Sequence, residues 1–97
     1  MKGSIIIVEE DRSGNSESST YAGNICHVSL DAAEKEWQET VEDAKTNHEG
    51  EFGWLADAIE ERPEDVQEKH PGERWVSFSD VFANDLLNIY IHEVTIE

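Results

Sequence analysis

The stretch Ser4-Ile5-Ile6-Ile7-Val8-Glu9, close to the N-terminus, decides the fold class of this chain. β-branched residues favour strands, and four consecutive apolar residues put apolar side chains on both faces of an extended chain. A strand that is apolar on both faces is buried on both sides of its sheet. We therefore predict that residues 4–9 form a strand in the interior of the domain.

Three further segments fit strands. Residues 88–97 alternate between apolar and polar positions, residues 74–79 contain Trp75 and Val76, and residues 21–30 return to an apolar pattern after the Ser- and Gly-rich loop predicted at residues 11–20. We expect residues 21–30 to pair with the first strand as a hairpin, and the first and last strands to be neighbours. Residues 80–87 fit either a helical turn or a connection.

Two helices are predicted in the middle of the chain. Asp31 is a candidate N-cap with Glu34 in the capping-box position, and residues 47–50 end this helix. Its apolar stripe consists of Ala33, Trp37, Val41, Ala44 and, as a possible last member, His48. A second helix covers residues 51–61 and is stopped by Pro63, and a short third helical piece is expected at residues 64–69.

The order of these elements predicts an α+β fold. We expect a two-layer sandwich in which an antiparallel or mixed sheet of about four strands carries two to three helices on one face. A chain of 97 residues is enough for a single hydrophobic core, so residues 1–97 are predicted to form one acidic domain.

Composition restricts the partners and the compartment. The chain has 23 acidic and 7 basic residues, so anionic lipids and the phosphates of nucleic acids would repel it. The apolar run at residues 5–8 is too short for a signal peptide or a membrane span. A lone cysteine, Cys26, cannot form an internal disulfide, which favours a reducing compartment. We therefore predict a cytoplasmic protein with no direct contact to nucleic acid or membrane.

The sequence contains no pattern typical of catalysis. His27, His48, His70 and His92 are 21 to 22 residues apart, whereas metal ligands are usually closely spaced pairs. Cys26 lies in a predicted strand without an activating base, so we interpret it as a small core residue. We predict no catalytic residues, no metal and no cofactor, and hence a protein that is not an enzyme.

Negative charge is concentrated in the two predicted helices. Residues 31–68 contain 14 acidic and three basic residues, which is −11 of the total −16. Carboxylates three or four positions apart on a helix are neighbours that repel each other, so stability alone does not favour them. We predict that a partner binds to the following residues: Glu36, Glu39, Glu42, Asp43, Asp57, Glu60, Glu61, Glu64, Asp65 and Glu68. Solvated helix faces and adaptation to salt are the alternative explanations.

This profile resembles the small acidic inhibitors that phages and mobile elements use against defence systems, namely anti-CRISPR proteins and anti-restriction DNA mimics. The resemblance covers size, charge, the single domain and the carboxylate-lined helices, and no diagnostic motif carries it. It implies that carboxylates stand in for DNA phosphates and occupy a basic, nucleic-acid-binding groove of a CRISPR surveillance complex, restriction enzyme or nuclease. It also implies a location in the bacterial host cytoplasm.

Two other hypotheses use the same features. An immunity or antitoxin-like protein that neutralises a basic nuclease toxin would need the same acidic surface. A non-catalytic structural or regulatory subunit would instead bury its strand edges in an assembly. The sequence leaves monomer and dimer open.

Overall fold

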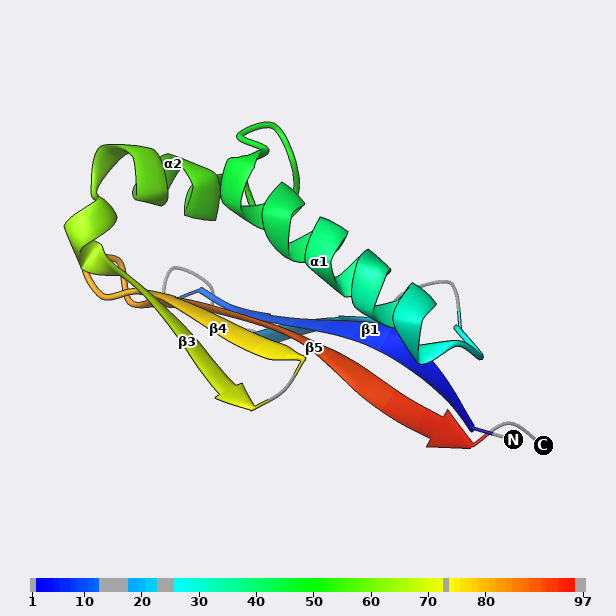
Figure 1. Ribbon diagram of the computed structural model, residues 1–97. Coiled ribbons are helices and arrows are strands. Elements are labelled where there is room, and N and C mark those ends of the chain that lie inside the picture. The colour runs from blue at the N-terminus through cyan, green and yellow to red at the C-terminus, as the bar shows by residue number, and fades with distance from the viewer. Residues whose placement is uncertain (1, 13–17, 23–25, 73, 96–97) are drawn as a thin grey trace.

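The computed structural model describes residues 2–12, 18–22, 26–72 and 74–95, with the backbone alone for residues 18–22. Five strands form one sheet in the order β2-β1-β5-β4-β3, and every neighbouring pair is antiparallel. Their bounds are β1 (Lys2–Asp11), β2 (Ser18–Ala22), β3 (Val66–Gly72), β4 (Trp75–Asp80) and β5 (Asp85–Thr95). Two helices, α1 (Leu30–Thr46) and α2 (Gly53–Glu61), lie over one face of this sheet (Figure 1). The predicted α+β class is confirmed.

The first and last strands are neighbours, as predicted, and their pairing runs from Lys2↔Thr95 to Asp11↔Leu86. The side chains of β1 are buried on both faces: Ile6 is 2% exposed towards the helices and Ile7 is 9% exposed on the opposite face. On that opposite face Ile7 is paired with Tyr90, and the Tyr90 ring lies 4.9 Å from the ring of Trp75. The Ile run of β1 therefore contributes buried side chains to both faces of the sheet, as its composition predicted.

The hydrophobic core lies between the sheet and the helices. Phe78 and Leu55 are its largest fully buried side chains, one from β4 and one from α2. Trp37 of α1 packs against the core, and its indole N–H donates a hydrogen bond to the carbonyl of Ile89 at 3.0 Å. The buried core cluster consists of Ile6, Val8, Ala44, Leu55, Val76, Phe78, Leu87 and Ile89.

Helix α1 follows the predicted apolar stripe but starts differently. Ala33 and Ala44 are buried, whereas the N-cap is Ser29, whose side chain accepts a hydrogen bond from the Ala32 N–H. The prediction of Asp31 as the N-cap was wrong. The helix begins one residue earlier, at Leu30, so the cap position falls on Ser29. Asn47 ends the helix, within the predicted stop at residues 47–50.

The connection between the helices is tight. A β-carbon on Gly53 would lie 2.2 Å from the carbonyl oxygen of His48, so this first residue of α2 has to be glycine. His48 itself lies beyond the end of α1 and is exposed, so it does not belong to the buried stripe.

Strand β3 replaces the third helical piece predicted at residues 64–69. Pro63–Asp65 forms only one 3-10 turn, η1, and from Val66 onwards the chain pairs with β4. The Asp65 carbonyl accepts a hydrogen bond from the Val81 N–H, and the chain joins the sheet at this point. Glu68 therefore lies on a strand, and the prediction that it continues the helical row of carboxylates was wrong.

Two smaller corrections concern the loops. Strand β2 lies at Ser18–Ala22, partly inside the predicted loop, and Cys26 is exposed and outside any strand, so it is not a core residue. Residues 81–84 form a turn between β4 and β5. Within the described ranges, the helices are too short or too polar to cross a lipid bilayer.

Candidate binding surface

Helix α1 exposes carboxylates on the side away from the sheet. Glu39, Glu42 and Asp43 are exposed, whereas Ala33 and Ala44 on the other side of the helix are buried. This division follows from the helical period, because residues about two positions from the apolar stripe point away from the core. Three of the predicted partner-binding residues are therefore gathered on the outer face of α1.

The second helix and the loop before it extend this charge. Asp57, Glu60 and Glu61 are exposed on α2, and Glu64 is exposed in η1. Glu49 and Glu51, in the loop between the helices, are exposed as well. We call the following residues the helical acidic surface: Glu39, Glu42, Asp43, Glu49, Glu51, Asp57, Glu60, Glu61 and Glu64. The sequence-based prediction missed Glu49 and Glu51 because it considered helix faces and not the loop that joins them.

Three predicted partner-binding residues contact basic side chains that link them to other elements of the fold. Glu36 is only partly exposed and contacts the imidazole of His27, and Asp65 lies 3.8 Å from Arg62. Glu68 forms an ion pair with Lys45 at 3.1 Å between β3 and α1. These carboxylates connect parts of the fold, so we leave them out of the helical acidic surface.

His48 bridges two carboxylates of that surface. Its Nδ1 lies 2.5 Å from Asp57 Oδ1 and its Nε2 lies 3.1 Å from Glu60 Oε2. Only the imidazolium form can donate hydrogen bonds from both nitrogens. The hydrogen bond with Asp57, and then the charges of Glu60 and Asp57, raise the pKa of His48 above 6.5.

This raised pKa predicts a stability that falls as the pH rises. A group with a higher pKa in the folded state stabilises the fold fully below its unfolded pKa, here about 6.5, and loses this effect as the pH passes through the folded pKa. In urea unfolding measured from pH 6 upwards, the wild-type midpoint should decline over this window, and His48→Gln should remove that part of the decline. His92→Gln, at an exposed position near the end of β5, serves as the control and should retain it.

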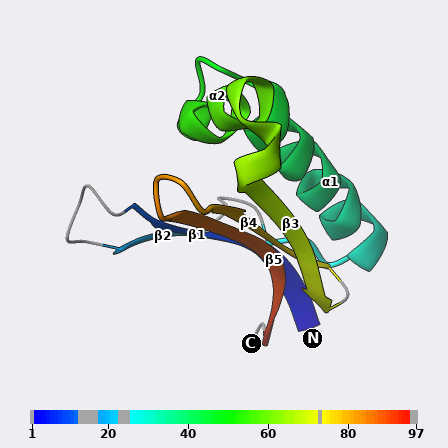
Figure 2. The same ribbon diagram turned by 90° about the vertical axis from the view of Figure 1, so that its left-hand side faces the viewer.

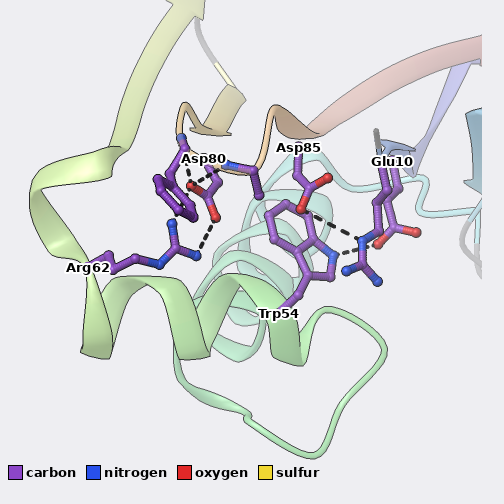
Figure 3. A network of polar contacts seen from close by, with 8 residues as sticks. Glu10, Trp54, Arg62, Asp80 and Asp85 are labelled. Atoms are coloured by element: carbon purple, nitrogen blue, oxygen red, sulfur yellow. Dashed lines mark hydrogen bonds and ion pairs between the residues drawn. The ribbon is translucent and has the colours of Figure 1, made fainter. Parts of the chain in front are cut away.

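An ion pair between the buried Asp80 and the partly exposed Arg62 fixes the C-terminal end of α2 (Figure 3). Asp80, which is 2% exposed, accepts two hydrogen bonds from Arg62, from Nη1 at 2.9 Å and from Nη2 at 2.8 Å. Asp80 Oδ1 also accepts the backbone N–H groups of Phe82 and Ala83. These interactions lower the pKa of Asp80, and the hydrogen bonding by Arg62 has the largest effect. Asp80 therefore holds both α2 and the β4–β5 turn.

The N-terminal end of α2 is fixed to β1 by a second contact in Figure 3. The Trp54 indole N–H donates a hydrogen bond to Glu10 Oε2 at 2.7 Å. The Arg12 guanidinium lies 5.5 Å from the centre of the Trp54 ring and 3.9 Å from Asp85. Because both of its ends are attached to the sheet, α2 presents its carboxylates in one orientation.

The four histidines lie in different places. His27 and His48 contact carboxylates of α1 and α2, His70 lies 3.7 Å from Glu68, and His92 is exposed on β5. In the part of the chain that the structure describes, no group of three His, Cys, Asp or Glu side chains could hold a metal ion.

Comparison with family models, curated proteins and solved structures finds no match to this chain.

Proposed function

We propose that this protein is an acidic inhibitor that acts by binding and not by catalysis. Its target is a basic, nucleic-acid-binding groove of a bacterial defence complex, in which its carboxylates replace the phosphates of DNA. One observation supports this proposal above all: the helical acidic surface exposes nine carboxylates over both helices, their loop and η1, whereas the same layer has three Lys and Arg residues, of which Lys45 and Arg62 are used in ion pairs and Lys35 is exposed on α1. Such a target places the protein in the bacterial cytoplasm.

The size of the molecule fits this role. Its longest dimension is 43 Å, and one turn of duplex DNA measures roughly 34–36 Å. The whole molecule is therefore of the same order of length as one turn of duplex DNA. Charges of one sign on a rigid layer also accelerate encounter with a basic groove, by roughly 10- to 1000-fold in favourable cases.

Displacement of DNA tests the proposal directly. Labelled duplex DNA is bound to a purified CRISPR surveillance complex or restriction enzyme, and the protein is added while fluorescence anisotropy is recorded. We expect release of the DNA at low salt and weaker release at high salt, because exposed charges are screened. Saturating protein that leaves DNA bound across a panel of such complexes would contradict the proposed function. Inhibition of a nuclease toxin without competition for DNA would favour an immunity protein instead.

Reversal of one charge gives a sharper test. Glu39→Lys, on the outer face of α1, should slow association with the target roughly two- to fivefold at low salt and much less at high salt. Glu93→Lys is the matched control, because it changes the net charge equally at an exposed position on β5, where Glu93 pairs with Lys2. Stopped-flow association rates measure both variants. Equal slowing by both would assign the effect to net charge and not to the helical acidic surface.

A further inference from the structure

The turn between β4 and β5 exposes two large apolar side chains next to each other. Val81 is 55% exposed and Phe82 is 76% exposed, which is the highest value among the exposed large hydrophobic residues of the described chain. Isolated exposed apolar residues are common on protein surfaces. The attachment of Phe82 to the fold distinguishes it from such residues.

Phe82 contacts both members of the Arg62–Asp80 ion pair. Its backbone N–H donates to Asp80 Oδ1 at 3.2 Å, and its ring lies 4.8 Å from the Arg62 guanidinium carbon. Arg62 is itself fixed by two hydrogen bonds to Asp80. An aromatic side chain that is already ordered in the free protein loses little conformational entropy on binding, which is the property of an anchor residue.

The surroundings of Phe82 indicate the chemistry of its partner. Arg62 follows Glu61 and is two positions before Glu64, and both of these carboxylates are exposed members of the helical acidic surface. The positive charge of Arg62 is already balanced by Asp80 and Asp65. An incoming surface at the Phe82 ring therefore meets Arg62, whose sequence neighbours Glu61 and Glu64 carry exposed carboxylates. The complementary site is an apolar pocket with Lys or Arg side chains at its rim.

We propose that Phe82, supported by Val81, is the anchor that inserts into such a pocket, and that the carboxylates of α2 and η1 bind its basic rim. This inference rests on the proposed function and assigns different kinetic roles to the carboxylates and to Phe82. The carboxylates determine the rate of encounter, and Phe82 determines the lifetime of the complex, because apolar contacts form only after docking.

The probe is a phage-displayed library of random peptides, selected on the immobilised wild-type protein. We expect enriched peptides that combine Lys or Arg with aromatic or aliphatic residues. For these peptides Phe82→Ala should weaken binding roughly 10- to 100-fold through faster dissociation, and Phe82→Tyr should restore most of the affinity. The paired variant Glu61→Lys/Glu64→Lys should slow association instead. Val28→Ala, at an apolar position that is 70% exposed before α1, is the control and should change neither rate.

The outcomes separate the anchor from the proposed function. Basic peptides that bind Phe82→Ala as well as wild type would overturn the anchor and leave the acidic surface standing. Peptides without Lys or Arg that respond to Phe82→Ala alone would contradict the basic partner and therefore the proposed function. Failure to enrich any peptide would count against both. Thermal unfolding of Phe82→Ala close to that of wild type excludes misfolding as the cause of a loss.

Discussion

Replacing Phe78 with alanine is expected to lower the free energy of unfolding by about 3–5 kcal/mol. Phe78 is fully buried at the centre of the core cluster, between the sheet and the helices. Its removal loses the transfer energy of the ring and leaves a cavity that the surrounding side chains fill only in part. Domains of this size are stable by about 5–15 kcal/mol, so the variant should lose from roughly a fifth of this stability to all of it.

Urea unfolding measures this loss, and Phe82→Ala provides the matched control. The same atoms are removed from a side chain that is 76% exposed, so the expected loss is less than about 1 kcal/mol, most of it the contact with Arg62. Comparable losses in the two variants would show that the interior is not organised around Phe78. A small loss for Phe82→Ala would also confirm that this variant is a fair test of binding.

Replacing Asp80 with alanine is expected to destabilise the protein by about 2–3 kcal/mol. The carboxylate is buried and accepts hydrogen bonds from Arg62, Phe82 and Ala83, all of which would lose their acceptor. The value lies below that of a fully buried ion pair because water reaches Arg62, whose side chain is 31% exposed. For a domain of this length the melting temperature should fall by roughly 10–20 °C. Glu42→Ala, at an exposed position on α1, is the control and should change the melting temperature little.

The same carboxylate predicts a specific loss of stability in acid. The pKa of Asp80 is lowered in the folded protein, so its contribution is present above the unfolded pKa of 3.8 and is lost as the pH falls through the folded value. Asp80→Asn cannot titrate and should therefore show a shallower decline in stability below pH 4 than the wild type. Parallel declines for the two proteins would show that Asp80 is not the group responsible.

The sequence predicted the parts of the fold that depend on local pattern. The Ile5-Ile6-Ile7-Val8 run specified a strand buried on both faces, and the spacing of Ala33 and Ala44 specified which side of α1 packs on the sheet. Pro63 marked the end of α2, because proline cannot continue a helix. Each of these features depends on residues close together in the sequence, so each can be predicted from a single sequence.

The errors lie where a distant partner decides the local structure. The composition of residues 64–69 is compatible with an exposed helix. In the structure the Val81 N–H donates a hydrogen bond to the Asp65 carbonyl, and the chain pairs with β4 from Val66 onwards. Cys26 occupies an apolar-looking segment, but the described pairing of β2 with β1 ends at Ala22, so it is exposed. Propensity is a weak guide in both segments because tertiary contacts outweigh it.

The candidate surface was likewise predictable from the sequence only in part. The sequence by itself determined that negative charge is concentrated in residues 31–68 and that α1 directs Glu39 and Glu42 away from its apolar stripe, because the helical period fixes that direction. Only the tertiary structure decided which carboxylates contact basic side chains. Lys45 reaches Glu68, Arg62 reaches Asp80 and His27 reaches Glu36. These pairs join residues 9 to 23 positions apart in the sequence, and only the packing of helices on the sheet brings such residues within reach of each other.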